Sequence, residues 1–201
     1  MKLLLASSSA HKVAEIQRML DRTGLELTVV GLGDVPAYPE PVENGASFED
    51  NAMIKAEAGF ADCGWPTLAD DSGIEVDVLN RMPGIRSARW AGVGATDQDN
   101  LDLLLRQLAD VEPERRTARY VCAMALVTPV LRLVVRGVVE GRLATQPRGD
   151  GGFGYDPIFL PEGGAKTAAE LAPADKDAIS HRGRALAAIL PALQAVAEVP
   201  R

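Results

Sequence analysis

Short apolar runs and a helical pattern follow one another over the first thirty residues. Residues 2–7 form a compact apolar run that serines close, which predicts a short buried strand. From Val13 to Leu20 the apolar residues recur at helical spacing, with charged residues between them. This spacing predicts an amphipathic helix that ends near Gly24. Residues 25–31 are again mostly apolar and predict a second strand.

The next stretch is rich in proline and glycine and predicts a loop. Ser47 and Asp50 then match the capping box that opens a helix. This helix is predicted to run to about Cys63, where a Trp-Pro pair follows closely. Residues 67–69 and 74–79 predict two strand pieces on either side of an acidic turn.

The second half of the chain repeats this interleaving of elements. Thr96 and Asp99 form another N-cap signal, and the stripe of leucines behind it predicts a helix. Residues 118–127 and 131–140 are rich in β-forming residues, and the Thr-Pro pair between them predicts a hairpin. A last long helix is predicted at 180–197, where an internal proline is expected to kink it.

Strands and helices interleave along the whole chain, which predicts an α/β fold with a mixed sheet. The length of 201 residues fits one domain. No internal repeat is visible, and neither the glycine-rich loop nor the turn near 92–96 divides the chain strongly. We therefore expect a single domain over residues 1–201 with an ordinary globular core.

The chain is acidic, with a formal net charge of −7. This balance argues against nucleic acid as a partner, although a small anionic substrate could still bind through local positive charge or a metal ion. No apolar run approaches the ~20 residues of a membrane span, and the N-terminal run is too short for a signal peptide. The two cysteines are too few for a disulfide scaffold. We expect a soluble cytoplasmic protein.

The first candidate for chemistry is the serine-rich segment between the first strand and the first helix. It comprises Ser7, Ser8, Ser9, Ala10, His11 and Lys12. Backbone N–H groups at a helix N-terminus attract anions, and the hydroxyls and the lysine add donors, so phosphates could bind here. The segment lacks the spaced glycines of a P-loop. Serine caps with a solvated lysine are the alternative.

The second candidate is the acidic pair Asp70 and Asp71, which follows an apolar run. Two adjacent carboxylates are favoured when a divalent cation lies between them and a substrate. Since neighbours on a strand point to opposite faces, only one is expected to reach the site directly. Glu43 could complete a magnesium site with Asp71, and Lys55 could face a phosphate. A solvated acidic turn and loop remain the alternative.

The third candidate is the glycine-dense segment at 149–159. Glycines allow close approach of a ligand, and Phe153 and Tyr155 are expected to be exposed rings on which a nucleobase could stack. Asp156 could accept hydrogen bonds from ring N–H groups or orient a basic neighbour. A tight turn with core aromatics is the alternative.

The fourth candidate is a basic cluster at a helix start, formed by Lys176, His181 and Arg182. Donors from His181 and Arg182 would match the O6 and N7 acceptors of a 6-oxo purine and would reject a 6-amino purine. Solvated basic residues at a helix N-terminus are the alternative. Together the four segments supply what a nucleotide-processing site needs.

These segments also resemble a known family. The similar segments, in chain order, are LLLASSSAHKVAEI, SFEDNAMIKAEAGF, LADDSGIEVDVLNRMPGIRSARWAG, ATDQDNL, GGFGYDPIF and KTAAELAPADKDAISHRGRAL. They are similar in sequence to those of the inosine/xanthosine triphosphate pyrophosphatases. The resemblance covers roughly residues 2–190. It implies an elongated mixed β-sheet flanked by helices, in two lobes with the active cleft between them. It also implies a homodimer and Mg²⁺-dependent hydrolysis of non-standard purine triphosphates (ITP, dITP and XTP) to the monophosphate and pyrophosphate.

The resemblance assigns roles by position. The triphosphate is expected to contact residues 7–12 and Lys55. Glu43 and Asp71 match the metal-linked acids, and Asp71 matches the proposed general base. The remaining substrate contacts that the resemblance implies are Ser72, Phe153, Gly154, Tyr155, Asp156, Lys176, His181 and Arg182.

One departure from the family pattern concerns the first loop. The family usually has Thr-Gly-Asn-x-x-Lys there, whereas this chain has serines at positions 7–9. Ser9 has a shorter reach than asparagine, so its contact with triphosphate or metal would be weaker or water-mediated. The same loop is similar to that of Maf-type pyrophosphatases acting on dTTP or UTP, which lack the ISHRG segment. That substrate class, and a non-catalytic nucleotide-binding regulator, are the alternatives.

Overall fold

The computed structural model describes residues 1–7 and 9–198. By its internal contacts the chain divides into two compact units. Unit 1 comprises Met1–Asp71, Cys122–Gly137 and Arg182–Arg201, and unit 2 comprises Ser72–Val121 and Val138–His181. The chain passes from one unit to the other inside three strands and, at His181–Arg182, inside a helix, so no linker separates them in the sequence.

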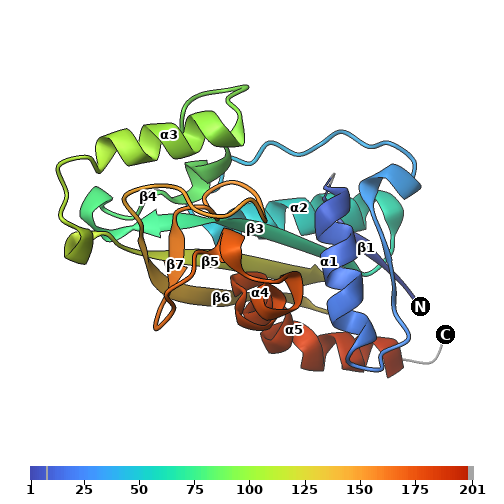
Figure 1. The fold of residues 1–201 in the computed structure, drawn as a ribbon. Helices are drawn as coiled ribbons and strands as arrows, with labels where there is room; N and C mark the ends of the chain where they lie inside the picture. The colour runs from blue at the N-terminus through green and yellow to red at the C-terminus, as the bar shows by residue number, and fades with distance from the viewer. Residues whose placement is uncertain (8, 199–201) are drawn as a thin grey trace. The chain divides into compact units, whose positions relative to one another are not determined.

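A mixed β-sheet confirms the predicted α/β class (Figure 1). Its strand order is β2-β1-β3-β5-β6-β7, with β4 paired to β3. β1 is parallel to β2 and β3, whereas β3–β4 and β6–β7 are antiparallel. The strands are β1 (Lys2–Leu5), β2 (Thr28–Val30), β3 (Thr67–Val76), β4 (Met82–Pro83), β5 (Thr117–Val127), β6 (Arg132–Leu143) and β7 (Phe159–Pro161).

Unit 1 has helices on both faces of its strands. The helices are α1 (Ala10–Asp21), α2 (Phe48–Cys63) and, apart from its first residue, α5 (His181–Glu198). Leu3 and Leu5 of β1 share one buried cluster with apolar residues of α1 and α5. Leu4 points the other way, since a Cβ built on Gly59 of α2 would lie 3.1 Å from its side chain. Side chains that alternate along β1 therefore pack against helices on both faces of the sheet.

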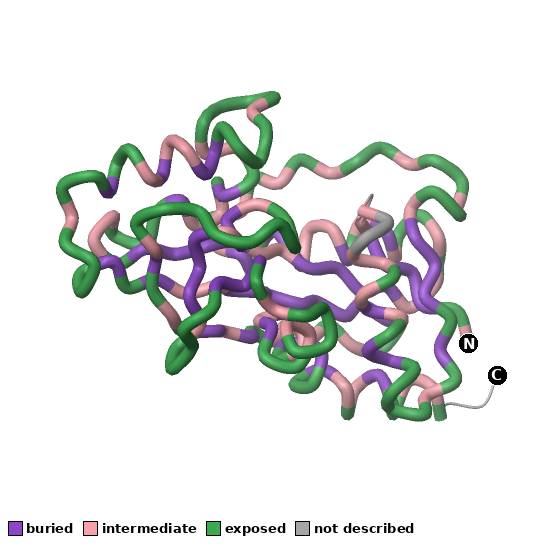
Figure 2. The backbone as a smooth tube through the Cα atoms, viewed as in Figure 1, coloured by how far each residue is buried: buried purple, intermediate pink, exposed green. Residues whose placement is uncertain are grey.

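Unit 2 has its own apolar core, to which Ile74 of β3, Leu104 and Phe159 contribute. Its helices are α3 (Asp97–Gln107) and the short α4 (Pro173–Ile179). Figure 2 shows that buried residues follow the strands, while the long connection between β2 and α2 is largely exposed or half-buried. Glu43 lies on that connection.

The helix starts at Ser47 and Thr96 are confirmed: Ser47 forms the predicted capping box, and Thr96 is the predicted N-cap and also forms a box with Asp99. The prediction of an acidic turn between two strand pieces is wrong. Residues 67–76 form one continuous strand, β3, in which Asp70 and Asp71 are extended like their neighbours. Pairing with adjacent strands outweighs the low intrinsic β-preference of aspartate and glycine. The helix α4 was not predicted from the sequence.

Neither cysteine is in a disulfide: Cys122 is buried and Cys63 is half-buried. None of the helices in the described ranges combines the length and apolar character that crossing a bilayer needs.

Candidate active site

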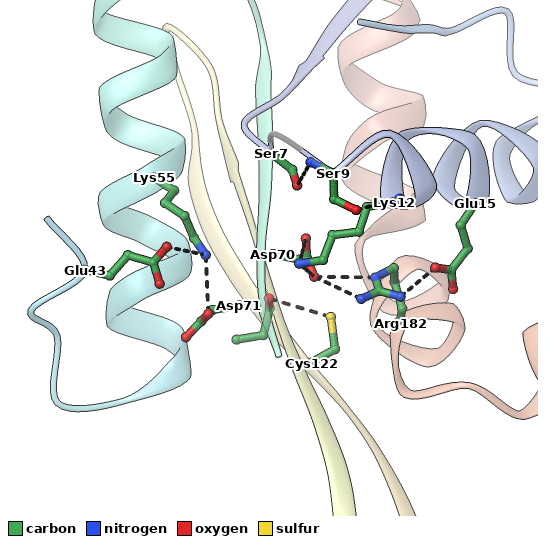
Figure 3. Close-up of polar contacts among 11 residues, drawn as sticks. Ser7, Ser9, Lys12, Glu15, Glu43, Lys55, Asp70, Asp71, Cys122 and Arg182 are labelled. Carbon is green, nitrogen blue, oxygen red and sulfur yellow. Dashed lines mark hydrogen bonds and ion pairs between the residues drawn. The ribbon is translucent and has the colours of Figure 1, made fainter. Parts of the chain in front are cut away.

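Asp70 and Asp71 point to opposite faces of β3, as strand geometry requires. Figure 3 shows the two groups that result. Asp71 lies on the side of Lys55 and Glu43, whereas Asp70 lies on the side of Lys12 and Arg182. Both groups belong to unit 1, so one strand presents two carboxylates to two separate sets of cations.

On the first face, one ammonium group joins two carboxylates. Lys55 Nζ lies 3.3 Å from a carboxylate oxygen of Asp71 and 3.3 Å from one of Glu43. Asn51 Nδ2 donates to Asp71 at 3.2 Å. Asn51 and Lys55 are four residues apart on α2, so both reach the same side of the helix. The capped helix thus positions both partners of Asp71.

Burial raises the pKa of Asp71 above its usual value, even though Lys55 and Asn51 act in the opposite direction. A carboxylate with a raised pKa binds a proton more readily, which suits a general base. Burial lowers the pKa of Lys55, but Asp71, Glu43 and Asp70 raise it by more, so the amine stays charged.

The donor set on this face fits a divalent cation. Two carboxylates from different elements already converge on one positive group, and Mg²⁺ is commonly held by one or two carboxylates together with substrate phosphates. Within the described part of the chain, no three His, Cys, Asp or Glu side chains are grouped as a metal cluster. A metal site here would therefore need substrate oxygens to complete it.

On the second face, Asp70 is buried and bonded to two cations. Lys12 Nζ donates to its two oxygens at 3.0 and 2.9 Å, and the Arg182 guanidinium contacts Oδ2 at 3.4 Å. Glu15 accepts a hydrogen bond from Arg182 at 2.6 Å. Burial alone would raise the pKa of Asp70, but Lys12 and Arg182 hold it far below its usual range. Asp70 is thus a permanent anion on the face opposite Asp71.

The serine-rich segment leads directly into α1. Ser9 is the N-cap, and its side chain accepts a hydrogen bond from the Lys12 backbone N–H. Ser7 Oγ accepts from the Ser9 N–H at 3.2 Å. Ala10 and His11 begin the helix, and Ser8 lies outside the described residues. The segment therefore combines a capped helix N-terminus with a half-buried lysine in its first turn.

Unit 2 contains a second polar cluster around Asp156, which is buried. Lys176 Nζ donates to Asp156 Oδ2 at 2.6 Å and lies 5.3 Å from the centre of the Phe153 ring. The Phe153 N–H donates to the same oxygen at 2.8 Å. Gly152 has φ +77°, and a Cβ there would collide with the Asp156 carboxylate. The glycine is required by both its conformation and its neighbour.

Next to this cluster, His181 stacks on Tyr120, with ring centres 4.9 Å apart and an interplanar angle of 13°. Both residues line one pocket with Asp156, Phe159 and Lys176. We call this the β5 pocket, because Tyr120 comes from β5. His181 and Arg182 are consecutive, yet His181 belongs to unit 2 and Arg182 to unit 1.

The expectation of two exposed aromatic rings holds for only one of them. Phe153 is 55% exposed, whereas Tyr155 is buried and its hydroxyl donates to the Ser87 carbonyl at 2.8 Å. The Gly154 N–H donates to Asp97 at 3.0 Å. Ser72 is half-buried on β3, immediately after Asp71. Tyr155 is therefore a core residue of unit 2.

Three residues in these clusters were missed from the sequence: Glu15, Asn51 and Tyr120. Helical spacing held a signal for two of them. Glu15 is three residues after Lys12, and Asn51 is four residues before Lys55, so each shares a helix face with a candidate. For Tyr120 no local signal existed, because its partners lie on other elements.

A half-buried carboxylate with a raised pKa, beside a lysine and a second carboxylate, is a set of groups suited to hydrolytic chemistry on an α/β fold. Residues 3–192 match the model of the Ham1 family, and the chain belongs to this family.

Its relatives agree with this assignment. A Mycobacterium bovis protein named dITP/XTP pyrophosphatase is 55% identical over 98% of this chain and 97% of its own length. A solved structure from Mycobacterium abscessus, described as nucleoside-triphosphatase / dITP/XTP pyrophosphatase, is 55% identical with a TM-score of 0.79, covering 95% of this chain and 100% of that one. A HAM1 protein from Coxiella burnetii is 40% identical with a TM-score of 0.86, covering 96% and 98%.

Proposed function

We propose that this protein hydrolyses non-standard purine nucleoside triphosphates, namely ITP, dITP and XTP, to the monophosphate and pyrophosphate. Its family membership and relatives named dITP/XTP pyrophosphatase support this activity. The observation that carries the chemistry is the convergence of Asp71 and Glu43 on Lys55. This arrangement supports the proposal of a half-buried base at Asp71 next to a position for positive charge.

In the proposed reaction, Asp71 accepts a proton from a water molecule. The water oxygen forms a bond to the α-phosphorus while the bond from that phosphorus to the bridging oxygen breaks. Pyrophosphate leaves with the bridging oxygen. The raised pKa of Asp71 favours proton transfer, and Asn51 keeps its carboxylate oriented through the hydrogen bond to Oδ2.

We propose Glu43 and Asp71 as the residues that hold Mg²⁺. When bound, the ion would neutralise phosphate charge that an acidic chain would otherwise repel. Lys55, which contacts both carboxylates, would contribute a further positive charge for the phosphates. Asp70, which sequence reasoning also placed at the metal, is proposed instead to hold Lys12 through their paired contacts.

The serine-rich segment is proposed to bind the triphosphate. Ser7, Ser8 and Ser9 supply hydroxyls, and the N-terminus of α1 at Ala10 and His11 supplies backbone N–H groups. Lys12 adds a full charge. Donors aimed at the leaving pyrophosphate stabilise the charge that develops there.

We propose that the nucleobase is recognised by the β5 pocket and its neighbours. Phe153 offers an exposed ring for stacking. His181 and Lys176 donate toward the purine edge, and Asp156 holds Lys176 in place. Arg182 is proposed as a second donor to the 6-oxo group, held by Asp70 and Glu15. A 6-amino purine would leave these donors unpaired, which is a strong basis for rejection.

The test is pyrophosphate release from ITP, XTP, GTP, ATP, dTTP and UTP, each with and without Mg²⁺. Fast, Mg²⁺-dependent release from ITP and XTP with slow ATP is expected. Preference for dTTP or UTP would mean that the first loop defines the substrate class. Binding of ITP without turnover would indicate a regulator, and either outcome would contradict the proposal.

The specificity residue has its own test. His181→Ala is expected to lower the ratio of kcat/KM for ITP over ATP by ~10-fold or more, because a donor to the 6-oxo group is lost. An unchanged ratio would remove His181 from recognition.

We also propose that the protein acts as a cytoplasmic homodimer. The family resemblance supports the assembly, and the free thiols of Cys63 and Cys122 are typical of a reducing compartment. Light scattering of the purified protein should give twice the chain mass of 21.3 kDa. A mass equal to one chain across the micromolar range would contradict the dimer.

A further inference from the structure

Tyr120 connects polar groups of the β5 pocket with one another. Its ring stacks on the His181 imidazole at 4.9 Å with an angle of 13°. Its hydroxyl donates to Asp156 Oδ1 at 3.2 Å. The other oxygen of Asp156 accepts from Lys176. One side chain therefore contacts the histidine directly and the lysine through the aspartate.

Packing holds Tyr120 firmly in this position. Its ring lies 4.5 Å from the Phe159 ring, centre to centre, at a tilted angle of 53°, an arrangement that aromatic pairs prefer. Phe159 is fully buried in the core of unit 2. Burial and the nearby Asp156 raise the pKa of Tyr120 well above its usual value, so its hydroxyl stays protonated as a donor. A rigid ring and a permanent donor are suited to orient other groups.

We propose that Tyr120 is a positioning residue of the nucleobase pocket, whose ring sets the plane of the His181 imidazole and whose hydroxyl sets the Asp156 carboxylate. This inference rests on the proposed function. Imidazole recognition of a purine edge requires the ring to lie in a defined plane, because its N–H donors lie in that plane. A ring that rotates freely must first lose that freedom before it can bind.

The kinetic test compares Tyr120→Leu, which removes the ring plane, with Tyr120→Phe, which keeps it. For Tyr120→Leu we expect KM for ITP to rise ~2–10-fold, as the loss of one aromatic pair allows, with kcat changed less than KM. The ITP-over-ATP ratio of kcat/KM should fall. Tyr120→Phe keeps the ring and should therefore stay close to the wild type in KM and in the ITP-over-ATP ratio. Its remaining difference from the wild type measures the contribution of the hydroxyl. Tyr38→Phe, the same chemical change in unit 1, is the matched control.

A second readout does not depend on turnover. The chain has two histidines, His11 and His181, so the variant His181→Gln assigns the imidazole resonances by NMR. The His181 ring protons should be shifted upfield in the wild type and in Tyr120→Phe, and should lose this shift in Tyr120→Leu. If Tyr120→Leu does not fold, Tyr120→Met replaces it in both measurements. Methionine fills more of the space of tyrosine and also has no ring.

The outcomes separate the inference from the proposed function. An active wild type with an unchanged KM and ratio in Tyr120→Leu would overturn the inference alone. A phenylalanine variant as impaired as the leucine variant would overturn the role of the ring. A wild type that neither binds nor hydrolyses ITP would overturn the proposed function, and this inference with it.

Discussion

At the scale of the residue, the adjacent carboxyl groups of Asp70 and Asp71 differ in their proton affinity. Burial raises the pKa of both, but Lys12 and Arg182 outweigh it only at Asp70. One carboxylate therefore stays charged and holds cations, while its neighbour can take up a proton. Environments that move two pKa values apart are a common basis for dividing roles within an active site.

The first prediction concerns the proposed base. Asp71→Asn should lower kcat ~10²–10⁴-fold, because an amide cannot accept the proton from water. Thermal unfolding should show that the variant remains folded. Asp62→Asn on the exposed part of α2 is the control and should keep wild-type kcat. Near-normal turnover in Asp71→Asn would exclude Asp71 as the base.

A second residue-scale prediction concerns Gly152. Gly152→Ala should raise KM for ITP, since the new Cβ would collide with Asp156 and lie 2.9 Å from Lys176 Nζ, at a φ of +77° that disfavours alanine. The expected rise is ~10-fold, equivalent to about 1.4 kcal/mol. Gly33→Ala is the control, because a Cβ at this position would have no atom within 4 Å and its φ is not positive. Equal KM values for both variants would contradict the role of Gly152.

The sequence identified several single site residues, but not the residues that they contact. Lys12 and Asp156 were recognised as candidates, because charged groups beside loops and helix starts have local signals, whereas the role of Lys55 came from the family resemblance. Their partners depend on elements that are distant in the chain: Lys12 meets Asp70, 58 positions later. No local pattern encodes such a contact.

At the scale of the element, α2 is the support for the Asp71 face. Its N-terminal box joins Ser47 and Asp50, and the same helix then presents Asn51 and Lys55 to Asp71. The alignment of these two side chains depends on a regular first turn. The stability of the cap is thus connected to the geometry around the proposed base.

Removal of this cap gives the third prediction. Ser47→Ala should lower the free energy of unfolding by about 1 kcal/mol, because the Asp50 N–H loses its acceptor. Urea unfolding monitored by circular dichroism measures the change. Ser47→Thr keeps a hydroxyl acceptor for the Asp50 N–H and should lose clearly less than the alanine variant. Equal losses in Ser47→Ala and Ser47→Thr would show that the side-chain hydrogen bond is not the cause.

The fourth prediction concerns the strands of unit 2, where Arg119 bonds Glu75, Asp77 and Glu140 at 3.4, 2.8 and 3.0 Å. Partial burial raises the pKa of Asp77, but hydrogen bonds from Thr117 and Arg119 lower it by more. Because the folded pKa is depressed, this stabilisation is present above the unfolded value of about 3.9 and is lost as the pH falls through the folded pKa.

Arg119→Met should therefore destabilise the protein by up to about 1 kcal/mol at pH 7. This difference from the wild type should stay constant down to about pH 4.5 and shrink below that, as urea titrations at successive pH values would show. Arg132→Met removes a more exposed pair with Glu57 and is the control. If the stability difference between the wild type and Arg119→Met grew as the pH fell, a lowered pKa of Asp77 would be contradicted.

Helix starts with strong local sequence signals were predicted correctly, whereas the continuous strand β3 was not. The boxes at Ser47 and Thr96 place two helix starts correctly. Across β3, the sequence DDSG resembles a turn, but ladder hydrogen bonds to neighbouring strands keep it extended. Such bonds depend on residues elsewhere in the chain, so local preference alone gives the wrong result.

At the scale of the whole molecule, an acidic chain is proposed to bind a polyanion. The net charge of −7 opposes this binding, so the site must supply positive charge locally. Lys12, Lys55 and Arg182 are each paired with carboxylates in unit 1. Bound Mg²⁺ would add the missing charge. The mixed sheet could be predicted from the order of elements. The boundaries of the two units could not, because they fall inside β3, β5, β6 and α5.

The fifth prediction follows from this charge balance. Chelation of divalent ions with EDTA should lower ITP hydrolysis by ~10²-fold or more, because phosphate charge is no longer neutralised, and excess Mg²⁺ should restore it. Glu43→Gln should raise the Mg²⁺ concentration needed for half-maximal rate. Full activity in EDTA, or an unchanged Mg²⁺ requirement in Glu43→Gln, would contradict the proposed metal site.

The alternation of Asp70 and Asp71 on β3 also constrains how this chain can change in length during evolution. Gain or loss of one residue between Thr67 and Asp70 would exchange the faces, turning an aspartate from the Lys12 side to the Lys55 side. A change of two residues would preserve the faces but shift the pairing with β1, which joins Leu4 to Thr67. Insertions and deletions among descendants of this chain are therefore expected in the exposed connection before α2, while the start of β3 keeps its length.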